Sequence, residues 1–148
     1  MPNTLTKLLI HITFSTRNRV PTIPAELEPD LYSYIGGICR RMKSPLHAMN
    51  GTADHVHMLI SLDKNIALAP LLLNIKRDSS KWLNERTPKR FNWQDGYFGF
   101  SIGESGVEVL TKYIAKQKPH HKKITFKEEV EALLAKYKMK YDPHEIWD

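Results

Sequence analysis

The segment from His55 to Leu62 constrains the fold more than any other part of this sequence. It is an apolar run that begins shortly after Asn50-Gly51, a pair typical of turns, so it is predicted to be a β-strand. Successive side chains of a strand point to opposite faces of the sheet. One face then carries only apolar side chains, which indicates that it packs on a core: Val56, Met58, Ile60 and Leu62.

The opposite face of this strand carries His55 and His57, at positions i and i+2. In an extended strand their Cα atoms are about 6 to 7 Å apart, so both imidazoles project side by side from one surface. Two imidazoles in this arrangement are suited to binding one metal ion. The alternative is a pair of polar residues on a solvated sheet face, and a third ligand from elsewhere in the chain is needed to favour the metal site.

Three further strands and four helices are predicted from the spacing of the apolar residues. The strands are expected at Leu5–Ser15, Pro45–Gly51 and Tyr97–Ile102, and the helices at 27–42, 68–83, 107–117 and 125–138. The first six elements follow the order of ferredoxin-like and RNA-recognition-like sandwiches. We therefore predict an α+β fold, a βαββαβ sandwich with an antiparallel four-stranded sheet, plus two C-terminal helices.

In such a sandwich two helices cover one face of the sheet, and the other face is free for a ligand or a partner. The alternation in the last strand places Phe98 and Phe100 opposite Gly99 and Ser101. We expect one set of residues to share the free face: His11, His55, His57, Tyr97, Gly99 and Ser101.

Two boundaries of the C-terminal helices are marked by specific residues. Pro119 is expected to end the helix at 107–117, because proline restricts the residue before it and has no amide proton. Thr125 and Glu128 have the spacing of a capping box, which starts the last helix.

The composition is that of a soluble globular protein, with 41% hydrophobic and 26% charged residues. We expect one domain over residues 1–148, since this length can bury a single core. No apolar stretch approaches the roughly 18 residues that span a bilayer, and the N-terminus lacks the layout of a signal peptide. The lone Cys39 is expected to be a small buried residue, and a cytoplasmic location is expected.

The formal net charge is +6, which favours polyanionic partners. The basic residues form several separate patches, so they indicate a groove or rim and not a basic tail. Five side chains are candidates for contacts with phosphate: Arg17, Lys76, His120, His121 and Lys122. The alternative for each is a solvated surface position.

Tyr113 and Gln117 are four residues apart in the predicted helix at 107–117, so they share one face of it. A glutamine carbonyl oxygen can complete a metal site begun by two imidazoles, and a tyrosine one turn away is then held beside that metal. Tyrosine is a known covalent nucleophile, and a divalent cation favours its phenolate and polarises a phosphate oxygen. The alternative is an ordinary half-buried helix pair.

His55-Val56-His57 is an HUH motif, in which a bulky hydrophobic residue separates two histidines. Together with Trp93–Tyr97 and Tyr113–His121, it closely resembles the small transposases of bacterial insertion sequences of the 200/605 type. The resemblance spans nearly the whole chain. It implies a single-strand DNA endonuclease and strand transferase that acts on hairpin-forming element ends.

The resemblance also implies a role for each candidate residue. Tyr113 would attack a phosphodiester, forming a 5′-phosphotyrosine and releasing a 3′-hydroxyl. His55, His57 and Gln117 would hold one Mg²⁺ or Mn²⁺. The protein would act as a homodimer, in which the tyrosine helix serves the histidine pair of the same or of the other subunit.

Two other functions stay open from the sequence. Relaxases and replication initiators nick DNA with the same chemistry, but they usually have a third histidine as ligand, whereas this chain offers Gln117. A non-catalytic nucleic-acid-binding module would keep the fold without the reaction. A zinc hydrolase or deaminase is disfavoured, because the chain has neither His-Glu-x-x-His nor Cys-x-x-Cys.

Overall fold

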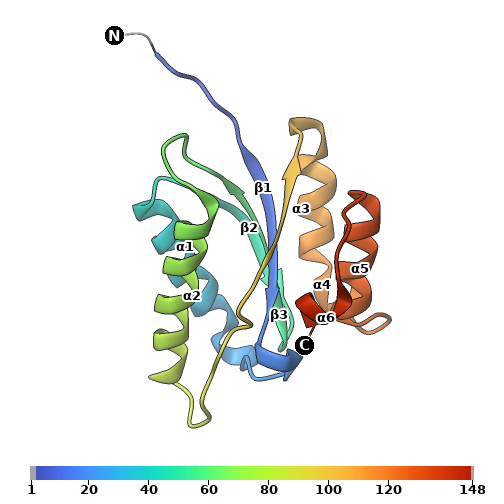
Figure 1. The fold of residues 1–148 in the computed structure, drawn as a ribbon. Coiled ribbons are helices and arrows are strands. Elements are labelled where there is room, and N and C mark those ends of the chain that lie inside the picture. Colours follow the sequence, from blue (N-terminus) through green and yellow to red (C-terminus); the bar gives the residue numbers. More distant parts are fainter. Residues whose placement is uncertain (1–2, 148) are drawn as a thin grey trace.

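The computed structural model describes residues 3–147, and at its centre is an antiparallel sheet of four strands in the order β2-β3-β1-β4 (Figure 1). The strands are β1 (Leu9–Ser15), β2 (Leu46–Gly51), β3 (His55–Ser61) and β4 (Phe98–Ile102). This arrangement confirms the predicted α+β sandwich. The two central strands, β3 and β1, are paired on both sides, so they form the most constrained part of the sheet.

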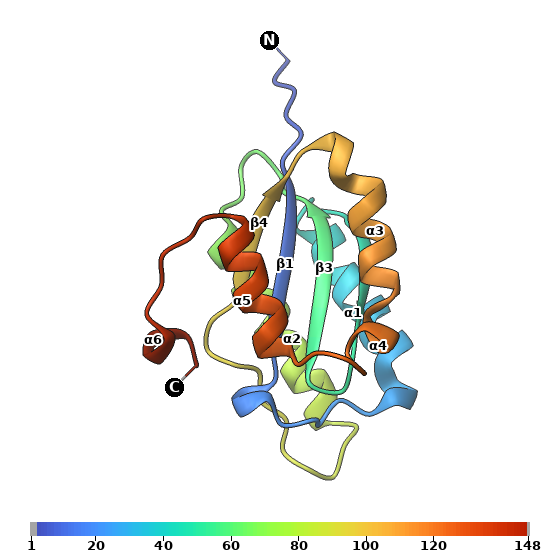
Figure 2. The same cartoon turned by 90° about the vertical axis from the view of Figure 1, so that its right-hand side faces the viewer.

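Helices cover both faces of this sheet, and Figures 1 and 2 show one pair on each side. The long helices are α1 (Glu28–Arg41), α2 (Leu68–Asn84), α3 (Val107–Ala115) and α5 (Phe126–Lys136). Two short helices follow α3 and α5, namely α4 (Gln117–His120) and α6 (Pro143–Trp147). Three 3₁₀ turns complete the list: η1 (Arg17–Arg19), η2 (Ala25–Leu27) and η3 (Glu104–Gly106).

The main core lies between the sheet and the pair α1 and α2. The apolar face predicted for the histidine strand points into it, since Val56, Met58 and Ile60 are fully buried there. Phe14 of β1 is buried beside them, with its ring edge-on to that of Trp93 at 4.9 Å between centroids. This packing places the alternate residues of β3 and β1 on the opposite face.

The prediction that the second face of the sheet is free is wrong, because α3 and α5 cover it. The prediction that Gly99 and Ser101 share this face is also wrong, since Phe100 pairs with His11 and Phe98 with Thr13 across β1 and β4. Phe100 packs on α5 in a small apolar cluster of Phe100, Phe126, Val130 and Leu134. Alternation alone cannot assign the faces of a strand that is covered on both sides.

The helix predicted at 107–117 is interrupted. α3 ends at Ala115, and Gln117 begins the short helix α4, which continues through Pro119 to His120. Pro119 therefore does not end the helix. It lies in the first turn of α4, where backbone amides have no partner within the helix and a missing amide proton costs nothing.

Three other predictions from the sequence concern single features. Cys39 is buried in α1 as expected, and burial raises the pKa of its thiol to about 11. No helix within residues 3–147 combines the length and the apolar character that crossing a bilayer requires. A single domain over residues 1–148 stays a prediction, and its first two residues and Asp148 lie outside the described part.

Candidate active site

His55 and His57 lie on β3, on the sheet face that α3 and α5 cover, and both side chains are fully buried. Their strand is reached through a tight turn after β2, in which the Thr52 amide donates to the His55 carbonyl oxygen at 3.0 Å. A Cβ atom on Gly51 would lie 2.1 Å from that oxygen, so the turn requires glycine. The turn therefore fixes where the first histidine enters the site.

The His55 ring is oriented by Asp54. The ring Nδ1 is 2.6 Å from Asp54 Oδ1, and Thr52 donates to the same carboxylate oxygen at 2.9 Å. Burial raises the pKa of Asp54, but the hydrogen bonds from His55 and Thr52 and the charge interactions with His55 and His121 together outweigh burial and hold the pKa below its usual value. Since an ionised carboxylate only accepts, Nδ1 carries the proton and the Nε2 lone pair faces the site.

The His57 ring has partners on both nitrogens. Its Nδ1 lies 2.8 Å from Nε2 of His11 on β1, and its Nε2 lies 2.7 Å from Oε1 of Glu129. Burial lowers the pKa of His57 to about 4 and that of His11 to about 3. Both rings are therefore neutral at pH 7, and neutral imidazole is the form that binds a metal ion.

Tyr113 and Gln117 come from α3 and α4 and reach the same point. The Tyr113 ring is edge-on to His57 at 5.8 Å between centroids, and its hydroxyl donates to Glu129 Oε2. Gln117 is fully buried, with Oε1 at 3.0 Å from His55 Nε2. The structure thus brings together all four residues of the predicted catalytic and metal set, and it does so within one chain.

Burial raises the pKa of the Tyr113 hydroxyl far above its usual value, and the hydrogen bond to Glu129 acts in the same direction. A positive charge beside the phenol would oppose both effects. A cavity of about 640 Å³ between α3 and α5 reaches Tyr113 and Glu129, so the Tyr113 side chain is accessible from that side.

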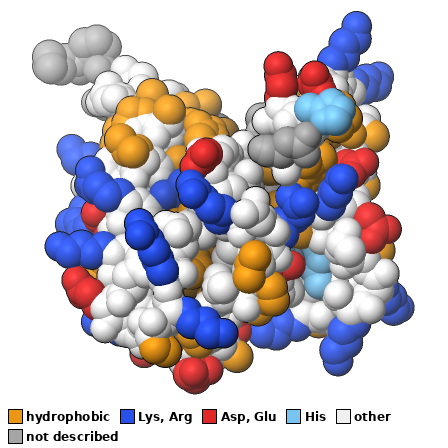
Figure 3. Space-filling model, turned by 60° about the horizontal axis from the view of Figure 1, so that its bottom comes forward, with side chains coloured by type: hydrophobic (Ala, Val, Ile, Leu, Met, Phe, Trp, Pro, Cys, Tyr) orange, Lys and Arg blue, Asp and Glu red, His pale blue; other side chains and the backbone are white. Residues whose placement is uncertain are grey.

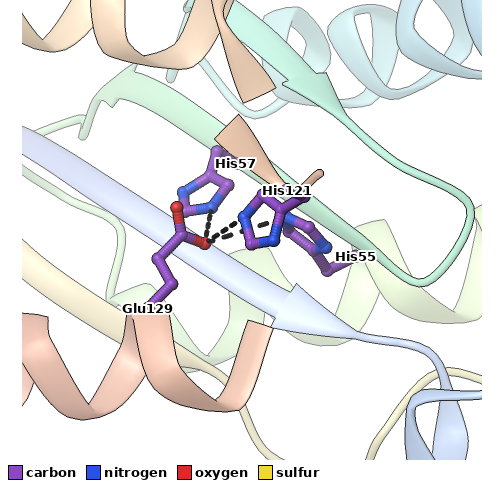
Figure 4. A group of neighbouring side chains, drawn as sticks. All are labelled: His55, His57, His121 and Glu129. Carbon is purple, nitrogen blue, oxygen red and sulfur yellow. Dashed lines mark hydrogen bonds and ion pairs between the residues drawn. The ribbon is translucent and has the colours of Figure 1, made fainter. Parts of the chain in front are cut away.

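Glu129 was not predicted from the sequence, yet it lies at the centre of the site (Figure 4). Its side chain is 2% exposed. Burial raises the pKa of Glu129, but hydrogen bonds from His121 and His57 outweigh burial and hold it well below its usual range. A signal was present in the sequence, because Glu129 is a carboxylate on the apolar face of its helix, between Phe126 and Val130.

His121 also joins the site, from the segment after α4. Its Nε2 lies 3.0 Å from Glu129 Oε1, and its ring centroid is 4.2 Å from that of His55. One ligand atom from each of His55, His57, His121 and Glu129 lies within 4.8 Å of all the others (Figure 4). This spacing is compact enough for a single metal ion.

The sequence matches the family model described as "Transposase IS200 like" over residues 4–117. The chain belongs to the IS200-like transposase family. Two solved structures share the fold of this transposase. A Deinococcus radiodurans R1 protein assigned as a transposase has a TM-score of 0.64 and 18% identity, over 79% of this chain and 95% of that one.

The second structure is a REP-associated tyrosine transposase bound to a REP hairpin. Its TM-score is 0.63 and its identity 17%, over 82% of this chain and 73% of that one. No curated protein matches the sequence. At these identities the two structures support the fold of the transposase, and the family assignment depends on the family match.

The residues predicted to contact DNA differ in their exposure and in their hydrogen-bond partners. Arg17 is exposed and pairs with Asp95 at 3.1 Å. Lys76 donates to the Gln94 carbonyl oxygen at 2.7 Å, and burial lowers its pKa to about 8, so it holds the loop before β4. Lys122 is exposed. These contacts with DNA stay predictions. Among Arg17, Lys76 and Lys122, Lys76 differs because its ammonium group is bound to a backbone carbonyl oxygen.

The two histidines among these candidates differ in exposure. His121 is 7% exposed and His120 is 32% exposed. His120 Nε2 lies 3.3 Å from Glu129 Oε2, and its ring is 5.3 Å from that of Tyr113. Both rings therefore lie beside Tyr113 or His55, so the structure groups them with the predicted catalytic and metal residues.

Thr125→Ala is expected to destabilise the transposase by about 1 kcal/mol and to lower its Tm by about 3 °C. Thr125 caps α5, since its hydroxyl accepts from the Glu128 amide at 3.1 Å and Glu128 Oε1 accepts from the Thr125 amide at 3.0 Å. This capping box confirms the predicted helix start. Thermal unfolding by circular dichroism measures the change, and the exposed Thr111→Ala is the control. Equal Tm values for both variants would contradict it.

Proposed function

We propose that this chain is a metal-dependent single-strand DNA endonuclease and strand transferase, with Tyr113 as the nucleophile. One observation carries the proposal. The Tyr113 hydroxyl, the two imidazoles of the HUH motif and the Gln117 amide converge on one buried point, although they come from three elements. A phenol beside metal-ligand side chains is an arrangement suited to covalent phosphodiester cleavage, because metal coordination is one way in which a nucleophile is activated.

In the proposed reaction the Tyr113 oxygen forms a bond to phosphorus as the bond to the 3′-oxygen breaks. The phenol loses its proton, and the departing 3′-oxygen gains one and leaves as a hydroxyl. A second 3′-hydroxyl later attacks the 5′-phosphotyrosine and restores the phenol. One phosphodiester is made for each one broken, so no external energy source is needed.

We infer that His55, His57 and Gln117 hold one divalent ion, Mg²⁺ or Mn²⁺. His55 Nε2 lies 3.0 Å from the Gln117 side-chain oxygen, a separation that two ligand atoms of one small divalent ion can have. When bound, the ion would polarise a phosphate oxygen and lower the pKa of the phenol. Gln117 and the histidines would fix its place beside Tyr113.

The proposed substrate is single-stranded DNA at hairpin-forming ends of a mobile element. The family membership supports this, and so does the fold shared with a protein that binds a REP hairpin. The charge of the chain agrees with a polyanionic partner, and Figure 3 shows Lys and Arg side chains spread over one end of the molecule. The family resemblance supports a homodimer, and Tyr113 beside His57 of its own chain supports a cis placement of the nucleophile.

One sequence argument against a relaxase or replication initiator fails. That argument is that Gln117 stands in place of a third histidine, but His121 reaches the same point as His55 and His57. The match to the transposase family is the observation that now favours transposition.

A cleavage assay tests the proposal. Labelled single-stranded DNA from the flanks of the gene is mixed with the protein, with Mn²⁺, with Mg²⁺ or with EDTA. We expect a covalent protein–DNA adduct that forms only with metal. Hairpin binding without any cleavage would instead identify a non-catalytic binding module, and cleavage without an adduct would exclude a tyrosine nucleophile.

A further inference from the structure

We propose that Glu129 and His121 complete the metal centre with His55 and His57, and that the second carboxylate oxygen of Glu129 positions the Tyr113 hydroxyl. The inference rests on the proposed function and deepens it. It assigns three imidazoles and one carboxylate to the ion, in addition to the Gln117 oxygen. It also gives Glu129 a role that links the metal to the nucleophile.

The distances around Glu129 Oε1 fit a shared ion. This atom lies 2.7 Å from His57 Nε2, 3.0 Å from His121 Nε2 and 3.8 Å from His55 Nε2. Ligand atoms bound to one small divalent ion at about 2.1 Å are on the order of 3 to 4 Å from each other. The four side chains therefore need only small movements to bind the same ion.

The buried negative charge also favours a cation at this point. Glu129 is buried, and within residues 3–147 every ion-pair partner of this carboxylate is a histidine. The Nε2 atom of His121 is buried and faces the same carboxylate, at 3.0 Å from Glu129 Oε1. A divalent ion bound between the carboxylate and the rings would balance the buried negative charge and accept the lone pairs of the ring nitrogens.

Both strand histidines are already oriented to present Nε2 to the ion. Nδ1 of His55 is bonded to Asp54, and Nδ1 of His57 is bonded to Nε2 of His11. A hydrogen bond on the far nitrogen is the usual way in which proteins fix a metal-binding imidazole. The His11 contact allows the His57 proton to move to Nδ1, which frees the Nε2 lone pair for the metal.

The second oxygen of Glu129 joins the ion to the nucleophile. Oε2 accepts from the Tyr113 hydroxyl and, at 3.2 Å, from Nε2 of Gln117. The carbonyl oxygen of the same Gln117 amide faces His55. Glu129 is thus a positioning residue for Tyr113, since it holds the phenol in one place next to the ion before DNA binds.

This ligand set also predicts a metal preference. Imidazole favours transition metals, whereas Mg²⁺ is bound mainly by oxygen ligands and water. A centre with three imidazoles is therefore expected to bind Mn²⁺ at least about tenfold more tightly than Mg²⁺.

The first test measures metal binding without DNA. Mn²⁺ is titrated into the full-length protein by isothermal calorimetry, with electron paramagnetic resonance to count the bound ion. We expect Glu129→Gln and His121→Asn each to weaken Mn²⁺ binding by at least about tenfold. The controls are Glu131→Gln on the same helix and the exposed His47→Asn on β2, which should bind as the wild type does.

The second test separates positioning from metal binding. At saturating Mn²⁺ we expect Glu129→Gln to form the Tyr113 adduct about tenfold more slowly in a single turnover, with unchanged affinity for hairpin DNA. A wild-type adduct rate at saturating Mn²⁺ would overturn the positioning role. Circular dichroism of each variant checks that it is folded.

The ligand assignment is overturned if Glu129→Gln and His121→Asn bind Mn²⁺ as tightly as the wild type. A Glu129→Gln variant that keeps wild-type Mn²⁺ affinity and cleaves DNA faster would show instead that the carboxylate blocks the phosphate position. Neither of these two results contradicts the proposed function, because the wild-type protein can still form its covalent adduct with DNA. Tight Mn²⁺ binding that depends on Glu129, without any adduct in the wild type, would refute the function alone.

Discussion

Tyr113→Phe is expected to abolish the covalent protein–DNA adduct and to reduce cleavage by at least about 10⁴-fold, because no other group replaces a lost nucleophile. The substitution removes one oxygen atom and leaves the ring edge-on to His57. Glu129 keeps its contacts with His57 and Gln117, so the loss of one donor should leave the protein folded. The adduct is measured on a denaturing gel with labelled DNA.

The matched control is Tyr137→Phe, at the residue that follows the C-terminus of α5. The Tyr137 hydroxyl donates to the Ser101 carbonyl oxygen at 3.2 Å, outside the reaction centre. Both variants lose one phenolic hydroxyl and one hydrogen bond, and only Tyr113→Phe should lose the adduct. An adduct that persists in Tyr113→Phe would mean that Tyr113 is not the nucleophile.

His57→Asn is expected to eliminate the stabilisation of the protein by Mn²⁺. A ligand that binds only the folded state at 100 times its Kd adds about 2.7 kcal/mol to the free energy of unfolding. For a chain of this length that corresponds to a rise in Tm of about 5 to 10 °C. Wild-type protein should show this rise with Mn²⁺ and lose it in EDTA, whereas His57→Asn should unfold at the same temperature in both.

The same variant should cleave DNA at least about 100-fold more slowly, since the charge stabilisation that a bound metal supplies is worth several kcal/mol. His47→Asn is again the control, because His47 lies on β2 with its ring exposed and bonded to Ser61. A rise in Tm with Mn²⁺ that is equal in His57→Asn and wild type would place the bound ion elsewhere in the protein.

The part of the site that lies on β3 is predictable from the sequence alone. The period of two places His55 and His57 on the face opposite Val56 and Met58, and the structure has them there. The contact between this pair and Gln117 follows from the family resemblance and not from the spacing, because α3 and α4 reach the sheet through tertiary packing. The same is true of the approach of Tyr113.

The rest of the site depends on contacts that no local pattern determines. Glu129 reaches His57 only because α5 docks on the face that was expected to be free. Phe100 is part of the surface on which α5 docks. The alternation in β4 separates Phe100 from Gly99 and Ser101, but it does not show which set faces α5, because helices cover both faces of the sheet. The sequence predicts His121 as a phosphate contact, with a solvated surface position as the alternative, because two lysines follow it.

The small apolar cluster that holds α5 has a consequence for how often the histidine pair becomes accessible. It is separate from the main core beneath α1 and α2, and elements held by small separate clusters open at a lower free-energy cost than the rest of a protein. Each opening of α5 carries the Glu129 carboxylate away from the strand histidines. The hydrogen-exchange rates of the α5 amides therefore report how often α5 opens and uncovers the histidine pair while the sheet stays folded.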